Sequence, residues 1–303
     1  MNYTVEVVHV NVRSGTKGSF HTMSSTRSVG AYGFRLEGAG QRLLVPAPPD
    51  WPLIRVVQEV AEPAPPPSLE IGDQHATVPL IGGGMVTVDR HPPQAVFKVP
   101  HHLTEDEIAH PYLGPIAALH AHWLGRQAFH GGAMVVGDRA WGVLGRRQAG
   151  KSSLLAEAQR RGVPVLADDL LVFEGRNVFA APRSLDLRQP AALHFGSGRL
   201  LGVVGQRERW RVELTPVPVC LPLAGWIFLR WGPEPGTELI GIRDRLVWLA
   251  ASRTVKVDSS DPAPLLRLAA LPALQLTGLK RWETLSPLFD SLLETIAGLE
   301  TPV

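Results

Sequence analysis

A lysine framed by glycines is the most informative group of residues in the sequence. The segment GRRQAGKS, from Gly145 to Ser152, fits the pattern G-x-x-x-x-G-K-[ST]. The glycines allow main-chain N–H groups to turn inward around phosphate oxygens, because no Cβ obstructs them. The Lys151 ammonium would neutralise these oxygens, and the Ser152 hydroxyl is a ligand for Mg²⁺. The spacing therefore predicts a phosphate-binding loop, with nucleotide contacts from Gly145, Arg146, Arg147, Gln148, Ala149, Gly150, Lys151, Ser152 and Ser153.

A pair of aspartates follows the next apolar run of the chain. In VPVLADD, Asp168 and Asp169 come directly after a short apolar strand, which is where side chains emerge at the phosphate-bearing edge of an α/β sheet. One carboxylate can hold Mg²⁺, directly or through water. The other can take the proton from an attacking hydroxyl, as phosphoryl transfer to a protein or small-molecule acceptor requires.

The elements around these residues are those that a phosphate-binding loop needs. The segment FHGGAMVVGDRAWGVLG, residues 129–145, predicts two strands joined by a glycine-containing turn. A helix is expected from Lys151 to about Arg161, with Gly162 as its C-terminal stop. The loop is thus predicted to lie between a strand and the start of a helix, so that the positive end of the helix dipole faces the anion.

The first hundred residues differ from the rest in their residue patterns, which are those of strands and turns. Tyr3–Val12 alternates like a strand, residues 33–46 resemble two short strands around a glycine turn, and a glycine turn precedes the strand expected at residues 85–89. Residues 61–70 are rich in proline and predict a loop. We therefore divide the chain into a β-rich N-terminal region (1–100), either for substrate recognition or as extra strands, and a P-loop kinase domain (101–303).

Helical patterns begin after residue 100. Thr104 and Glu107 have the spacing of a capping box. Ile116, Leu119, Trp123 and Leu124 then follow helical spacing and predict a buried face. Toward the end of the chain, residues 217–232 predict one or two buried strands, and residues 283–299 predict an amphipathic helix.

Composition limits the classes of function. The 303 residues are 45% hydrophobic and 19% charged, with a net charge of +2, so nothing in the bulk charge indicates nucleic acid or a membrane as partner. The single cysteine, Cys220, excludes an internal disulfide. The histidines show no clean metal-binding spacing, and His120 and His122 are interpreted as structural or exposed. The first residues lack the apolar core of a signal peptide, which predicts a cytoplasmic protein.

Residues 115–190 resemble the catalytic domain of the HPr kinase/phosphorylase family. The shared features are a histidine followed by glycine (His130-Gly131), a hairpin, the phosphate loop, a helix ending in RRG, and ADD. The family includes kinases encoded in ribosomal-peptide (lasso-type) biosynthetic clusters. The resemblance implies an α/β fold with a mixed β-sheet, a P-loop kinase core of the HPr kinase and PEP carboxykinase type, preceded here by the β-rich N-terminal part.

The resemblance also implies roles for individual residues. Lys151 and Ser152 would bind phosphate and metal, Asp168 would be the general base and Asp169 a metal-site carboxylate, and these two roles could be exchanged. His130 matches a histidine near the phosphate site, although a purely structural histidine is about equally compatible with the pattern. In SLDLR, Asp186 would be a carboxylate behind the residues that contact the phosphate, and Arg188 would stabilise negative charge.

The segment 196–214 is rich in glycine and arginine, and we interpret it as a mobile loop over the acceptor. Its Arg207, Arg209 and Arg211 either bind an acidic substrate or form a solvated basic face.

The combined expectation is an ATP- and Mg²⁺-dependent kinase for a Ser/Thr hydroxyl of a peptide or protein, such as a ribosomal-peptide precursor. A catalytically silent peptide-binding scaffold and a small-metabolite kinase remain as alternatives. Because members of this family often assemble, a homo-oligomer is compatible with the resemblance.

Overall fold

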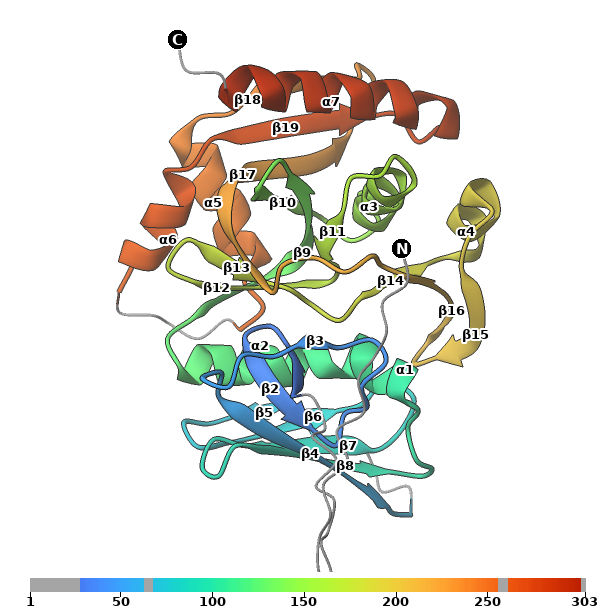
Figure 1. Cartoon of the computed structure of the whole chain (residues 1–303), viewed down its shortest axis with the longest axis vertical. Coiled ribbons are helices and arrows are strands. Elements are labelled where there is room, and N and C mark those ends of the chain that lie inside the picture. Colours follow the sequence, from blue (N-terminus) through green and yellow to red (C-terminus); the bar gives the residue numbers. More distant parts are fainter. Residues whose placement is uncertain (1–27, 63–67, 256–260, 301–303) are drawn as a thin grey trace, which may run out of the picture.

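Two eight-stranded sheets, with one buried helix between them, form the frame of the computed structural model (Figure 1). The structure describes residues 28–62, 68–255 and 261–300. The strand predicted at Tyr3–Val12 lies outside these residues, as do the central prolines of the loop predicted at 61–70. No helix within the described ranges is long and apolar enough to cross a lipid bilayer.

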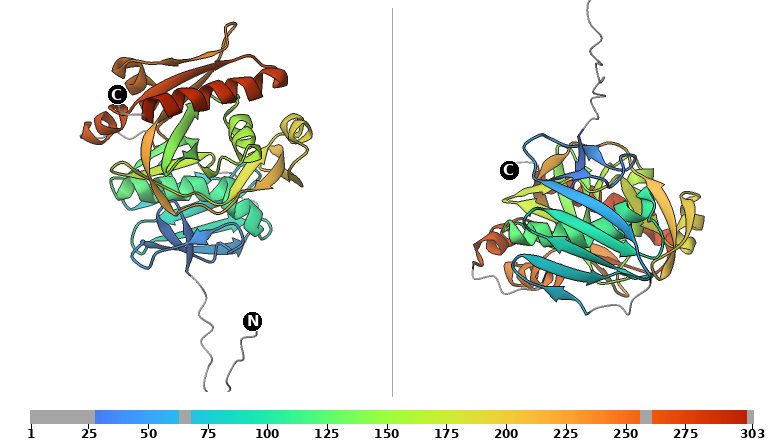
Figure 2. Two further views of the ribbon diagram at one scale, coloured as in Figure 1. Left: turned by 45° about the horizontal axis from the view of Figure 1, so that its top comes forward. Right: turned by 90° about the horizontal axis from the view of Figure 1, so that it is seen from below.

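The N-terminal sheet lies across one end of the molecule, with its strands side by side (Figure 2). Its strands are β1 (Val29–Ala31), β2 (Phe34–Glu37), β3 (Val45–Pro46), β4 (Leu53–Val60), β5 (Glu70–Ile71), β6 (His75–Pro79), β7 (Met85–Asp89) and β8 (Gln94–Val99). They follow the spatial order β3-β1-β2-β4-β8-β7-β6-β5. In β7 and β8 every second side chain is buried, which is the two-residue period of a sheet with one covered face. The two strands predicted in residues 33–46 are present as β2 and β3, but both pair with β1 and not with each other.

The connection to the second sheet is helical. The capping box is confirmed, because the Thr104 hydroxyl accepts from the Glu107 N–H and the Glu107 carboxylate accepts from the Thr104 N–H. The short helix α1 (Glu105–Glu107) passes through a π-helical turn (Ile108–Tyr112) into α2 (Leu113–Trp123). Helix α2 lies between the two sheets and is buried along most of its length (Figure 1). Leu124, expected on its buried face, is exposed because the helix ends at Trp123.

The second sheet is mixed, as predicted. Its strands are β9 (Gln127–Val136), β10 (Arg139–Gly145), β11 (Val165–Ala167), β12 (Leu170–Glu174), β13 (Asn177–Phe179), β17 (Cys220–Trp231), β18 (Gly236–Leu239) and β19 (Ala273–Gly278). The central strand β17 runs parallel to both β10 and β19, whereas the other pairings are antiparallel. The predicted hairpin at 129–145 and the long buried strand at 217–232 are therefore confirmed as β9–β10 and β17.

Helices cover both faces of this sheet. Helices α3 (Lys151–Arg160) and α7 (Leu285–Glu300) pack on the face that carries Trp141 and Ile227. Helices α5 (Ile242–Ser252) and α6 (Ala263–Ala269) pack on the face that carries Trp226 and Phe228. The alternation along β17 is what allows one strand to supply apolar side chains to both layers. The amphipathic C-terminal helix is confirmed, with Phe289, Leu292 and Ile296 fully buried.

A third, smaller sheet lies beside α3. It consists of β14 (Ser184–Leu187), β16 (Arg207–Glu213) and β15 (Arg199–Val204), and helix α4 (Gln189–Phe195) follows β14. The segment 196–214, interpreted from the sequence as a mobile loop over the acceptor, contains the β-hairpin of β15 and β16. The hairpin forms because β16 also pairs with β14, a partner about 25 residues earlier in the chain that supplies a second row of hydrogen bonds.

Candidate functional site

The segment Gly145–Ser152 joins the end of β10 to the start of α3, as the sequence predicted. Gln148 and Gly150 adopt left-handed backbone conformations, with φ of 67° and 95°. Glycine accepts this conformation freely, whereas for glutamine it is uncommon and must be supported by its surroundings. Such turns direct successive N–H groups into one concave space, which is the geometry that binds an anion.

Lys151 lies across its own loop. Its Nζ donates to the main-chain oxygen of Gly145 at 2.9 Å and to that of Arg146 at 3.4 Å. Burial lowers the pKa of Lys151, while the charges of Asp168 and Asp169 act in the opposite direction. The ammonium group is thus held within the loop, and it lies close enough to both carboxylates for their charges to act on it.

Asp168 follows β11 and is only 6% exposed. The Ser152 hydroxyl lies 3.5 Å from Asp168 Oδ1 and donates toward it. Burial raises the pKa of Asp168 to about 7, and the charges of Asp169 and Asp186 contribute to this increase. The carboxylate can therefore accept and release a proton near neutral pH, which is the property of an effective general base.

Asp169 has a different environment from its neighbour. Its backbone is left-handed, with φ of 69°, and its side chain is 41% exposed. Burial acts to raise the pKa of Asp169, but the charges of His110, His130, Arg209 and Arg207 outweigh this effect and lower it. The two adjacent carboxylates are therefore unlike, because at neutral pH Asp169 is ionised and Asp168 is close to its midpoint.

His130, on strand β9, holds the backbone of Asp169. Its Nδ1 lies 2.9 Å from the main-chain oxygen of Asp169 and 3.3 Å from Oδ1. A carbonyl oxygen only accepts, so Nδ1 carries the hydrogen. His130 thus positions the second aspartate, and it lines the same cavity as the loop.

Most of these residues line one cavity of about 1170 Å³. Of the predicted site residues, all of which the structure describes, those lining it are Arg147, Gln148, Ala149, Gly150, Lys151, Ser152, Ser153, His130, Asp169, Asp186 and Arg188. Gly145, Arg146 and Asp168 do not line it, and Asp168 reaches the site through its contact with Ser152. The volume of this cavity is large enough for a nucleotide together with part of an acceptor.

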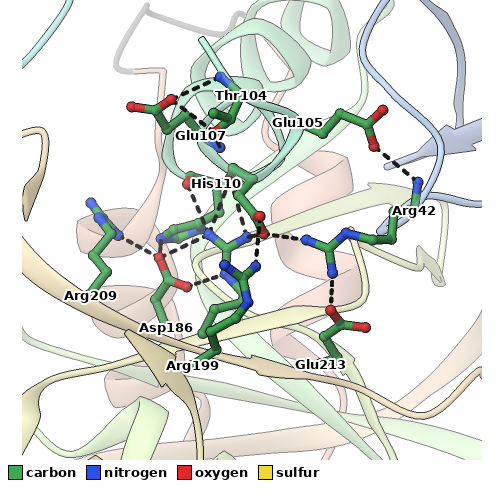
Figure 3. Close-up of polar contacts among 11 residues, drawn as sticks. Arg42, Thr104, Glu105, Glu107, His110, Asp186, Arg199, Arg209 and Glu213 are labelled. Atoms are coloured by element: carbon green, nitrogen blue, oxygen red, sulfur yellow. Dashed lines mark hydrogen bonds and ion pairs between the residues drawn. The ribbon is translucent and has the colours of Figure 1, made fainter. Parts of the chain in front are cut away.

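Asp186 lies at the centre of a buried ionic cluster (Figure 3). Arg209 Nη1 donates to its Oδ2 at 3.0 Å, Arg211 Nε donates to its Oδ1, and His110 Nε2 lies 3.6 Å from Oδ2. Arg209 and Arg211 are 7% and 2% exposed, so the expectation of a solvated basic face is wrong for these two arginines. The pairing of β14 with β16 places Arg211 directly opposite Asp186, and this brings the charges together.

The same cluster extends to the N-terminal sheet (Figure 3). Asp106, next to the capping box, accepts from Arg211 Nη1 at 3.0 Å, Arg199 Nη2 at 2.7 Å and Arg42 Nη2 at 2.6 Å. Arg42 also pairs with Glu213 at the end of β16. Charged side chains thus link the loop before β3, helix α1 and the β15–β16 hairpin.

Two contributors to the site were missed by sequence reasoning. His110 gave no local signal, because its partner Asp186 lies 76 positions further along the chain. Trp231, at the end of β17, donates from Nε1 to the main-chain oxygen of Gln148 at 2.9 Å. A Cβ added at Gly150 would lie 3.1 Å from the Trp231 ring. A sequence signal for the ionic cluster was the arginine at every second position of RERWR (207–211), together with the lone acidic residue of SLDL (184–187).

The comparisons with known proteins find similarity among solved structures. No protein-family model matches the chain, and no curated protein matches it in sequence. The structure is similar to that of the Hpr(Ser) kinase/phosphatase from Coxiella burnetii, with 11% identity, 58% of this chain and 99% of that chain covered, and a TM-score of 0.30.

Proposed function

We propose that the protein is an ATP- and Mg²⁺-dependent phosphotransferase that acts on a Ser or Thr hydroxyl of a peptide or protein, such as a ribosomal-peptide precursor. One observation carries the proposal. A left-handed loop, a buried lysine and Asp169 line one cavity, and Asp168, whose pKa is shifted in the opposite direction to that of Asp169, contacts Ser152 of the same cavity. Phosphoryl transfer needs these groups together, because its catalysis consists mostly of positioning and charge neutralisation.

The residues present fit a nucleotide with its metal ion. The inward-turning loop and Lys151 suit the phosphates. Ser152 and Asp169 offer hard oxygen ligands at the same cavity. Within the described ranges there is no group of three or more His, Cys, Asp or Glu side chains suited to hold a metal. Mg²⁺ usually takes one or two carboxylates from a protein and completes its shell with water and substrate phosphates.

The proposed chemistry is a direct transfer. The acceptor oxygen forms a bond to the γ-phosphorus while the bond from that phosphorus to the ADP oxygen breaks, and the hydroxyl proton passes to the Asp168 carboxylate. Lys151 neutralises the β- and γ-phosphate oxygens. Bound Mg²⁺ supplies further positive charge to the phosphates. His130 holds Asp169 by its main-chain oxygen and lies near its carboxylate, which would be a ligand of the metal ion.

The role of each aspartate can be tested by isosteric substitution. Because Asp168 is the proposed base, Asp168→Asn should retain Mg²⁺–nucleotide affinity and lose at least about 100-fold in turnover. Asp169→Asn should instead raise the Mg²⁺ concentration needed for half-maximal rate. Both effects are measured as transfer of labelled γ-phosphate under single-turnover conditions. An exchange of the two effects would assign the roles the other way round.

The acceptor class can be tested with a mixture of candidate substrates. The protein, Mg²⁺ and labelled ATP are incubated with Ser- and Thr-containing peptides, with precursor peptides encoded by neighbouring genes, and with free serine. The proposal expects phosphate on a Ser or Thr side chain of a peptide, located by mass spectrometry. Tight peptide binding without transfer would identify a scaffold, and transfer to free serine alone would identify a metabolite kinase.

A further inference from the structure

Three arginines occupy one face of strand β16. Arg207, Arg209 and Arg211 are spaced by two residues, so their side chains point to the same side of the strand. Arg211 and Arg209 are held by acidic groups and main-chain oxygens in the buried cluster, mainly by Asp186 and Asp106. Their charges are therefore already balanced within the protein.

Arg207 is the member of this row that reaches the cavity without a partner. It is half-buried and lines the cavity, and its side chain makes no hydrogen bond or ion pair with the residues that the structure describes. It lies close enough to Asp169 and Arg209 for its charge to act on both. A cation held beside a proposed transfer site is an attractive position for an anion that the protein itself does not supply.

An apolar wall from the N-terminal sheet borders the same end of the cavity. The turn between β6 and β7 carries Ile81, which lines the cavity and is 55% exposed. The turn is fixed by the Tyr112 hydroxyl, which donates to the Ile81 oxygen at 2.9 Å, and by close packing against Gly205 at the hairpin tip. The N-terminal sheet and the arginine hairpin therefore meet at the rim of the site.

We propose that this rim binds the acceptor, and that the acceptor is a peptide segment with an acidic side chain close to its Ser or Thr. Arg207 pairs with that carboxylate, and Ile81 contacts an apolar neighbour on the same segment. The inference rests on the proposed phosphotransferase function and adds its substrate class. Charge complementarity supports it, because the cavity is lined by eight Lys and Arg residues and only two aspartates.

The experiment uses a positional-scanning library of peptides with a central serine, labelled ATP and Mg²⁺. The wild-type protein should favour Asp or Glu at one position near the serine. The charge-reversing variant Arg207→Glu should lose this preference by roughly tenfold and favour Lys or Arg at the same position. The matched control Arg267→Glu makes the same change of charge at an exposed position of helix α6, outside the cavity, and should behave as the wild type.

A second variant tests the apolar wall. Ile81→Ser should reduce the preference for apolar residues beside the serine, and leave the preference for an acidic residue intact. Transfer by the wild type with no acidic preference would overturn this inference and leave the phosphotransferase proposal standing. A uniform loss across all peptides in Arg207→Glu would also overturn it, because Arg207 would then act on the nucleotide. Normal nucleotide binding with no transfer to any peptide would overturn the phosphotransferase proposal as well.

Discussion

At the scale of single residues, Trp231 shows how the loop from Gly145 to Ser152 keeps its shape. Its indole N–H bonds to the oxygen of Gln148, and its ring packs against Gly150, so one side chain supports both left-handed residues of the loop. The spacing of Gly145, Gly150 and Lys151 could be predicted because it is local. The support from Trp231 could not, because it comes from a strand 83 residues away from Gln148.

Replacing this indole should weaken nucleotide binding more than folding. Trp231→Phe keeps an aromatic ring and removes the bond to Gln148, which is worth about 1 kcal/mol. We expect the dissociation constant for Mg²⁺–nucleotide to rise by roughly fivefold, with little change in melting temperature. The control Trp248→Phe changes a half-buried tryptophan on α5, outside the cavity. Equal nucleotide affinity in both variants would show that Trp231 does not hold the loop in the conformation that binds the nucleotide.

At the scale of secondary structure elements, α2 shows what periodic patterns can and cannot predict. Its capping box and its positions Ile116 and Leu119 were visible in the sequence, because both signals span only a few residues. Its burial on nearly all sides was not visible, because two separate sheets cover it. Strand pairing could not be predicted from the sequence either, because it depends on strands that are distant in the chain. The hairpin at 199–213 depends on β14, and β2 and β3 depend on β1.

Burial of His120 within α2 should make stability depend on pH. His120 packs between Phe34 and Trp123, its Nε2 has no hydrogen-bond partner among the described residues, and burial lowers its pKa to about 4, against a smaller opposing effect of Asp89. Between pH 6.5 and 4 the unfolded state binds the additional proton, so the free energy of unfolding falls as the pH falls. The expected loss is about 3 kcal/mol.

Chemical denaturation at several pH values measures this dependence. His120→Phe, which keeps the aromatic contacts, should flatten the curve between pH 6.5 and 4 relative to the wild type. His122→Gln, two residues away and only half-buried, should leave the curve unchanged. A wild-type slope that persists in His120→Phe would show that other groups, such as the paired carboxylates, cause the loss.

At the scale of the whole molecule, the N-terminal sheet and the region after residue 100 share one hydrophobic cluster. Phe34 and Phe97 belong to the same cluster as Leu119 and Phe129. The ionic links from Arg42 to Asp106 and Glu213 join the two parts again at the surface. The composition change near residue 100 therefore marks a change of architecture, while the core continues across it.

A fragment that contains only residues 101–303 should not fold cooperatively. Removal of the first sheet would expose the face of α2 that it covers, and a helix that is apolar on most sides is not stable in water. We expect such a fragment to aggregate or to bind hydrophobic dyes without a cooperative thermal transition, whereas the full chain unfolds cooperatively. A soluble fragment with a sharp transition would show that the sheet is an independent addition.

The central claim is that the loop from Gly145 to Ser152 binds a triphosphate with Mg²⁺. Isothermal titration of a non-hydrolysable ATP analogue with Mg²⁺ tests it without knowledge of the acceptor. Saturable binding at one site is predicted for the wild type, with at least tenfold weaker binding in Lys151→Ala, because a charge-assisted contact is lost. Absence of binding in the folded wild type, or equal affinity in Lys151→Ala, would contradict the account.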